Sequence, residues 1–121
     1  MATRVLVVDD AKFMRHLLKN ILVEMGWDVV GEAADGDEAC EMYRALSPDV
    51  VTMDIVMPNT NGIEALKMIR DKDPAAKIVM ISAIDQREPL MDALKHGAAD
   101  YVVKPFEKER VEEALHRVVA G

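Results

Sequence analysis

Short apolar runs rich in β-branched residues alternate with segments of helical hydrophobic spacing along the whole sequence. Four of these runs have the length of a buried strand: Val5–Val8, Val50–Met53, Ile78–Ile81 and Tyr101–Val103. Continuous apolar runs bounded by polar residues are typical of parallel strands that are covered on both faces. A weaker run from Val29 to Ala34 contains Gly31 and Glu32, which predicts an edge strand.

One segment with apolar residues at helical spacing follows each run. These segments predict helices over Lys12–Met25, Asp37–Leu46, Asn61–Arg70, Gln86–His96 and Glu107–Val119. Gly26 and Gly97 lie just past the first and fourth helices, where a left-handed C-terminal cap is expected.

A strand followed by a helix, repeated along the chain, gives an α/β fold with a parallel sheet between two layers of helices. Right-handed crossovers leave few topologies, and an edge position for the second strand favours the order 2-1-3-4-5. The predicted fold class is therefore the flavodoxin-like (βα)5 doubly wound parallel sheet. Because no linker-like segment interrupts the 121 residues, we expect residues 1–121 to form a single domain.

An excess of acidic residues narrows the classes of partner. The net charge of −7 opposes binding to nucleic acid phosphates and to anionic membranes. No apolar run reaches the roughly 18 residues of a membrane-spanning helix, and the N-terminal residues show no signal-peptide pattern. The single cysteine, Cys40, excludes an internal disulfide and fits a reducing compartment, so we expect a cytoplasmic protein.

Polar residues end four of the predicted strands. Asp9 and Asp10 follow the first strand, Asp54 ends the third, Ser82 ends the fourth and Lys104 ends the fifth. In an open parallel sheet, ligands bind beyond the carboxyl ends of the strands, near the point where the strand order reverses. Three carboxylates, a hydroxyl and an ammonium group are therefore expected at one rim.

Each of these residues has a simpler explanation when it is taken alone. Asp9 and Asp10 precede a helix, and aspartate is a favoured N-cap. Asp54 would serve as a turn residue, Ser82 would bond to a neighbouring backbone group, and Lys104 would be a solvated loop residue. Their coincidence at the ends of adjacent strands favours a common site.

The chemistry of such a site follows from its charges. Close carboxylates repel one another and stay ionised only when a cation lies among them, and an open, all-oxygen site suits Mg²⁺. A carboxylate at Asp54, between the metal and Lys104, would attack phosphorus to give an acyl phosphate. The metal and the ammonium group would neutralise the developing charge, and Ser82 would bond to the phosphoryl group.

Four spaced motifs carry a resemblance to a known family. They are Val7-Val8-Asp9-Asp10, Met53-Asp54-Ile55-Val56-Met57-Pro58 followed by Gly62, Ser82-Ala83, and Lys104-Pro105-Phe106. The sequence resembles the receiver domain of two-component response regulators over essentially its whole length.

The resemblance implies a role for each matching metal and phosphoryl residue. Asp54 matches the phosphoacceptor. Asp9 and Asp10 match the acidic pair that supports Mg²⁺, with Asp10 the more direct ligand, and the backbone carbonyl of Val56 matches a further ligand. Lys104 matches the lysine that pairs with the phosphoryl group.

The resemblance also implies a switch. Ser82 matches the switch hydroxyl, and Tyr101 matches the aromatic residue that turns inward on activation. The peptide bond between Lys104 and Pro105 is expected to be cis, which is plausible only before proline.

The partners that the family implies are proteins. A CheA-like sensor histidine kinase would donate the phosphoryl group, and a phosphatase would assist its removal. The fourth helix, fifth strand and fifth helix would bind a flagellar motor switch protein or another target, in chemotaxis or other signalling.

The expected protein is a stand-alone, monomeric switch that catalyses only its own phosphorylation and dephosphorylation. Val56 and Ile84 match positions that flank the route of the hydrolytic water in the family. Because both are aliphatic here, the resemblance implies slow self-dephosphorylation.

Other classes remain open from the sequence. The chain could be the receiver part of a longer regulator or a phosphorelay intermediate. A flavodoxin-like electron carrier would need a Ser/Thr/Gly-rich phosphate loop where Asp9 and Asp10 stand. A phosphatase enzyme would need a second acid–base residue beside Asp54, and the sequence offers none.

Overall fold

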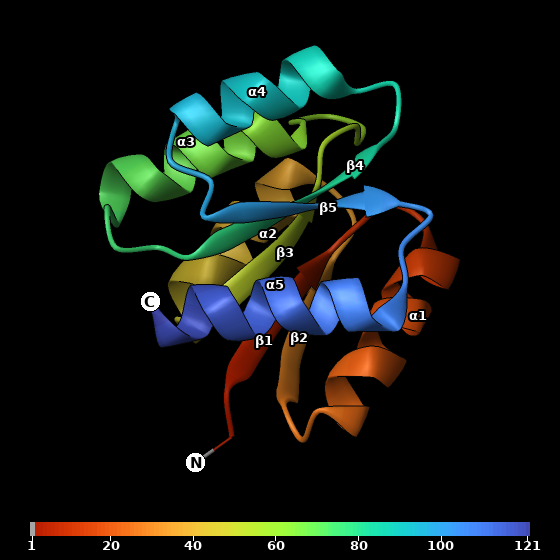
Figure 1. Cartoon of the computed structure of the whole chain (residues 1–121). Helices are drawn as coiled ribbons and strands as arrows, with labels where there is room; N and C mark the ends of the chain where they lie inside the picture. Colours follow the sequence, from red (N-terminus) through yellow and green to blue (C-terminus); the bar gives the residue numbers. More distant parts are fainter. Residues whose placement is uncertain (1) are drawn as a thin grey trace.

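Ten elements alternate along the chain in the computed structural model, which describes residues 2–121, and each strand is followed by a helix (Figure 1). The strands are β1 Arg4–Val8, β2 Asp28–Ala33, β3 Val50–Asp54, β4 Ile78–Ala83 and β5 Asp100–Lys104. The helices are α1 Lys12–Glu24, α2 Gly36–Leu46, α3 Gly62–Lys72, α4 Arg87–Lys95 and α5 Lys108–Ala120. Every predicted element is confirmed, and no end is displaced by more than two residues.

The strands form one parallel sheet in the order β2-β1-β3-β4-β5, as predicted. β2 is an edge strand, and its register against β1 shifts between Val5 and Leu6. Gly31 lies at this irregularity, where a Cβ atom would collide with Met42 and Leu46 of α2. The glycine that weakened the strand pattern therefore allows α2 to approach the sheet closely.

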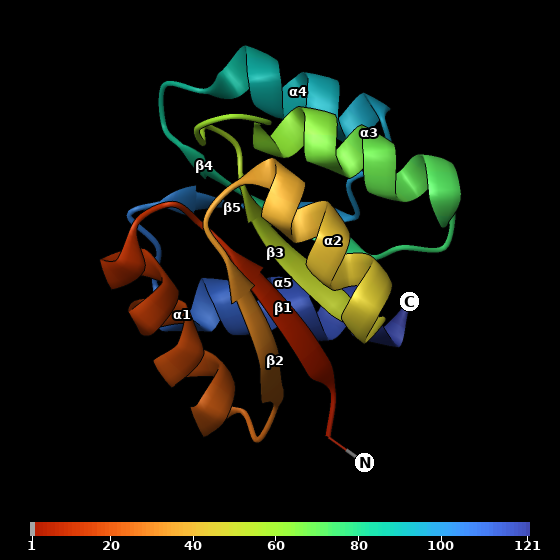
Figure 2. The ribbon, with the colours of Figure 1, turned by 180° about the vertical axis from the view of Figure 1, so that it is seen from behind.

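Helices cover both faces of the sheet. α1 and α5 lie on one face, and α2, α3 and α4 lie on the other (Figures 1 and 2). In β1, Val5 and Val7 pack under α1 and α5, whereas Leu6 and Val8 pack under the opposite layer. This alternation follows from the two-residue period of a strand, and it explains why the central strands are apolar at nearly every position.

Side chains cap the first turns of α2 and α3, two of the helices on that layer. Asp35, the N-cap of α2, accepts a hydrogen bond from Glu38 N, and the Glu38 carboxylate accepts one from Ala34 N, the residue before the cap. This arrangement is similar to a capping box. Asn61 caps α3 by accepting from two backbone amides of its first turn. The N-cap of α1 is instead Ala11, with no side-chain hydrogen bond.

The capping explanation of the first acidic pair is therefore wrong. Neither Asp9 nor Asp10 caps α1, because the helix begins at Lys12, after Ala11. The glycine caps are confirmed, since Gly26 and Gly97 have φ angles of 79° and 99°.

Both ends of the described chain lie at the amino ends of the strands (Figure 1). Thr3 O accepts from Asp28 N at the start of β2, and Lys77 Nζ, just before β4, lies 3.5 Å from Gly121 O. The carboxyl ends of the strands thus form the opposite rim of the molecule. None of the helices within residues 2–121 is long and apolar enough to cross a membrane.

Candidate functional site

The predicted site residues meet at the rim formed by the carboxyl ends of the strands. Asp9 directly follows β1, Asp54 and Lys104 are the last residues of β3 and β5, and Ser82 lies one residue before the end of β4. β1 and β3 are neighbours in the sheet although β2 separates them in the chain, so the site lies where the strand order reverses.

Three carboxylates converge at this rim. Oxygens of Asp9, Asp10 and Asp54 all lie within 4.8 Å of one another. Asp9 and Asp54 are only 1% and 6% exposed, whereas Asp10 faces solvent. The Lys104 ammonium lies 3.1 Å from Asp9 Oδ2 and 3.3 Å from Asp54 Oδ1. One partly buried cation therefore pairs with two of the three acids.

The excess of negative charge affects the Asp54 carboxyl. The pKa of Asp54 rises from 3.8 to about 6, because burial and the charges of Asp9 and Asp10 raise it by more than Lys104 lowers it. For Lys104, burial lowers the pKa, but the carboxylates of Asp54 and Asp9 outweigh burial and the pKa rises. A further cation would relieve the repulsion, and an all-oxygen donor set suits a hard divalent ion. The cluster is therefore compatible with Mg²⁺.

The loop after β3 is held close to the phosphoacceptor candidate. Ile55 N donates to Asp54 Oδ1 at 3.0 Å, and Gly62 N donates to Ile55 O at 2.7 Å. A Cβ atom at Gly62 would overlap the main-chain carbonyl of Asp54, so the turn requires glycine. Val56, the predicted carbonyl ligand, lies exposed in this loop beside the acidic cluster.

The hydroxyl of Ser82 is buried and makes no hydrogen bond within the described residues. Leaving a buried hydroxyl unpaired costs about 1–3 kcal/mol. An incoming ligand oxygen would recover that cost, so the geometry suits a residue that bonds to a bound group.

Tyr101 lies on the surface of β5, 37% exposed. The guanidinium carbon of Arg110 is 5.6 Å from the centre of the tyrosine ring, and Arg110 Nη2 donates to Tyr101 O at 2.6 Å. Tyr101 and Ser82 both line a cleft of about 420 Å³ beside α4. This cleft offers space that an inward tyrosine could occupy. The peptide bond between Lys104 and Pro105 is cis, as the resemblance implied.

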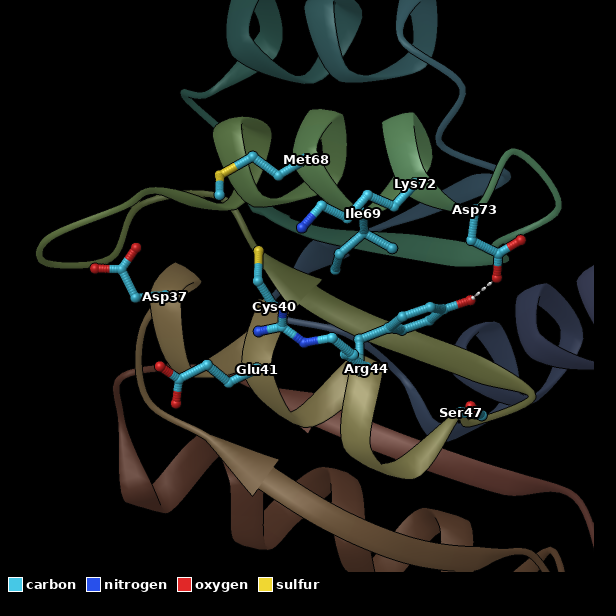
Figure 3. Close-up of a pocket in the computed structure, with 10 residues that line it drawn as sticks. Asp37, Cys40, Glu41, Arg44, Ser47, Met68, Ile69, Lys72 and Asp73 are labelled. Atoms are coloured by element: carbon cyan, nitrogen blue, oxygen red, sulfur yellow. Dashed lines mark hydrogen bonds between the residues drawn. The ribbon is translucent and has the colours of Figure 1, made fainter.

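A larger cleft of about 530 Å³ lies between α2 and α3 (Figure 3). Cys40 and Met68 line it, and Tyr43 Oη donates to Asp73 Oδ2 at 2.6 Å beside them. Burial raises the pKa of the Cys40 thiol, which makes it a weak nucleophile. None of the predicted site residues lines this cleft.

Arg15 of α1 is a site residue that the sequence did not predict. Its Nη1 donates to Asp9 O at 2.6 Å, and its Nε donates to Glu32 Oε1 at 3.1 Å. The available signal was its place in the first turn of the helix that follows the acidic pair. Because Arg15 bonds to a main-chain carbonyl, which every residue carries, the residue types alone do not indicate this contact.

Comparisons with known proteins agree with this geometry. The family model described as "Response regulator receiver domain" matches residues 5–116. The chemotaxis protein CheY of Thermotoga maritima is 53% identical over 118 residues, covering 98% of each chain. CheY of Bacillus subtilis is 50% identical, covering 98% of this chain and 99% of the relative.

A solved structure extends the similarity to the fold. The CheX–CheY–BeF3–Mg complex of Borrelia burgdorferi contains a chain that superimposes with a TM-score of 0.92 at 36% identity. The match covers 96% of this chain and 88% of that chain.

Proposed function

This chain belongs to the response regulator receiver domain family, and on that premise we propose that it is a chemotaxis switch phosphorylated on Asp54. The observation that carries the proposal is the convergence of Asp9, Asp10, Asp54 and Lys104 on one rim. The relatives named above are chemotaxis proteins, which supports that signalling role over others.

Phosphoryl transfer would use the side chain of Asp54 as the nucleophile. Its Oδ1 accepts hydrogen bonds from Ile55 N and Lys104 Nζ, so we assign the attack to Oδ2. A new bond forms between this oxygen and phosphorus while the bond from phosphorus to the donor nitrogen of a phosphohistidine breaks. The electron pair of that bond leaves with the imidazole. Lys104 remains beside the acceptor and offsets charge on the phosphoryl oxygens.

Mg²⁺ would be held by the carboxylates of Asp10 and Asp54, by the carbonyl of Val56, and by Asp9 partly through water. When bound, the ion would supply positive charge that offsets the charge developing on the phosphoryl group. The protein itself holds the carboxylates together in a partly buried site. Without the charge of the ion, burial and mutual repulsion make their ionised forms unfavourable.

The response would begin at Ser82. Its unpaired hydroxyl would bond to the new phosphoryl group, and Tyr101 would move into the cleft that both residues line. Phosphorylation would thereby favour a conformation that the free protein already samples. The altered surface of α4, β5 and α5 would then bind a target, such as a flagellar motor switch protein.

A histidine kinase of the CheA type is the proposed phosphodonor. The Borrelia burgdorferi structure contains a CheY together with CheX, BeF3 and Mg²⁺, which supports complex formation by the phosphorylated state. Val56 and Ile84 are exposed apolar residues in the loops after β3 and β4. They offer no polar group to a hydrolytic water, so self-dephosphorylation would be slow and a partner phosphatase would accelerate it.

Intact mass after incubation with acetyl phosphate tests the acceptor. Wild-type protein with Mg²⁺ is expected to gain one phosphoryl mass, and the same protein in EDTA is expected to gain none. Asp54→Asn removes the nucleophile and should gain none under either condition. Asp28→Asn, which makes the same charge change at an exposed position of β2, should behave as wild type. Equal labelling of Asp54→Asn and wild type would refute the assignment.

A further inference from the structure

Every hydrogen-bonding group of Asp9 is engaged by the protein. Its N–H donates to Ala33 O at 3.0 Å in β2. Its carboxylate accepts from Ala11 N at 2.9 Å and from Lys104 Nζ at 3.1 Å. Its carbonyl accepts from Arg15 Nη1 at 2.6 Å. These bonds hold both the main chain and the side chain of Asp9 in place, immediately before Asp10.

Asp10 has no comparable support. Its side chain is exposed, and the hydrogen bonds found within residues 2–121 include none to its carboxylate. The place of that carboxylate in the acidic cluster therefore depends on the backbone. Because the peptide unit is planar, the Asp9 carbonyl and the Asp10 Cα lie in one rigid plane. A donor that holds Asp9 O consequently orients the residue that carries the Asp10 side chain.

Arg15 is well suited to hold this plane. Its side chain is 16% exposed, and its Nε is paired with Glu32, whose other oxygen accepts from Lys19 Nζ at 3.0 Å. Glu32 lies on β2 opposite Val7 of β1 in the sheet register. The guanidinium group therefore bonds to the sheet through Nε and Glu32, and to the main chain after β1 through Nη1 and Asp9 O. Its rigid, planar set of donors allows both bonds at once.

We propose that Arg15 is a positioning residue that fixes the Asp9–Asp10 peptide and so sets the affinity of the acidic cluster for Mg²⁺. The inference rests on the proposed function, in which this cluster binds the ion. Arg15 touches no carboxylate of the cluster. It acts through the main chain, as supporting residues behind metal ligands commonly do.

Charge and positioning predict opposite results when Arg15 is replaced. Arg15 is a cation near the site, so its loss by charge alone would make the rim more negative and tighten Mg²⁺ binding slightly. Loss of its hydrogen bond to Asp9 O would let the Asp10 carboxylate move out of the cluster, which would weaken Mg²⁺ binding. The sign of the change therefore separates the two effects.

The experiment is a Mg²⁺ titration of the full chain, followed by backbone amide chemical shifts near the rim. Arg15→Gln is expected to raise the dissociation constant about tenfold, the lower end of the effect of residues that orient metal ligands. Arg15→Lys should fall between Arg15→Gln and wild type, because an ammonium group can donate to Asp9 O or to Glu32 but lacks the fork that spans both. Raising Mg²⁺ to saturation should restore the rate of labelling by acetyl phosphate.

Lys19→Gln is the matched control. Lys19 lies on the same helix, pairs with the same Glu32 and carries the same charge. Among the described residues it makes no hydrogen bond or ion pair with Asp9 or Asp10. We expect it to bind Mg²⁺ within about twofold of wild type. Urea unfolding of each variant establishes that the titrated proteins are folded, and Arg15→Lys carries the test if Arg15→Gln does not fold.

The outcomes distinguish the two proposals. If wild type binds Mg²⁺ and Arg15→Gln binds it as tightly as Lys19→Gln does, the positioning role is wrong while the proposed function stands. If wild-type protein shows no Mg²⁺-dependent shifts at the rim, the proposed function itself fails. A weakening confined to the Arg15 variants supports the inference.

Discussion

Replacing the phosphoacceptor candidate should stabilise the metal-free protein. The folded chain holds the Asp54 carboxyl at a pKa of about 6, against an ordinary value of 3.8. The difference, at about 1.4 kcal/mol for each pH unit, corresponds to about 3 kcal/mol of unfavourable free energy when the group is ionised. Asp54→Asn keeps the shape of the side chain and removes that charge, so at pH 7.5 the variant should be more stable by about 1–3 kcal/mol.

The pH dependence gives this prediction its sign. The unfolded chain releases the Asp54 proton near pH 3.8, whereas the folded chain keeps it until about pH 6. Between these values the folded state binds more protons, so its stability falls as the pH rises. The stability advantage of Asp54→Asn over wild type should therefore be absent near pH 3.5. It should grow from about pH 4 to pH 6, the window set by the two pKa values, and be constant above about pH 7.

Urea unfolding in EDTA across this pH range measures the effect. Asp28→Asn is the control, because it removes an exposed carboxylate and should leave stability nearly unchanged at every pH. Mg²⁺ should then narrow the gap, since an ion at 100 times its dissociation constant adds about 2.7 kcal/mol to wild type. Equal stability of wild type and Asp54→Asn at pH 7.5, or an advantage that does not vary with pH, would refute the reasoning.

Three further changes test other parts of the molecule. Gly62→Ala should destabilise the fold by at least about 3 kcal/mol in urea, because the added methyl group would overlap the Asp54 carbonyl; stability within about 1 kcal/mol of wild type would contradict the turn geometry. Thr52→Val should stabilise by about 1 kcal/mol, since the buried Thr52 hydroxyl has no partner among the described residues; a loss of stability would show that the hydroxyl is satisfied. Ile84→Gln should shorten the lifetime of the phosphorylated protein several-fold, measured as loss of phosphoryl mass, because an amide can hold a water beside the phosphorus; an unchanged lifetime would exclude that route.

The fold could be predicted because burial on both faces leaves a strong mark on the sequence. A central strand such as Val50–Asp54 is apolar at nearly every position, so its one acidic residue stands out. Asp54 and Lys104 are far apart in the chain, yet both end parallel strands, and parallel strands end at one rim. Their contact at 3.3 Å therefore follows from topology.

Other features left no comparable mark. The aspartates before α1 have the composition of a helix cap, but the helix starts at Lys12 after an uncapped Ala11, and only backbone geometry decides this. The long side chains of Arg15 and Arg110 reach main-chain carbonyls. A carbonyl is present at every residue, so nothing in the sequence indicates which one such a side chain will contact.

The distance of both chain ends from the reactive rim has a practical consequence. Because Thr3 and Gly121 lie at the amino ends of the strands, a fluorescent tag or a surface tether added at either end would stand behind the molecule. A partner that approaches the acidic rim itself would meet the same unobstructed surface as in the untagged protein. Immobilised or labelled forms of the chain are therefore suitable for measuring how quickly such a partner binds to the rim and dissociates from it.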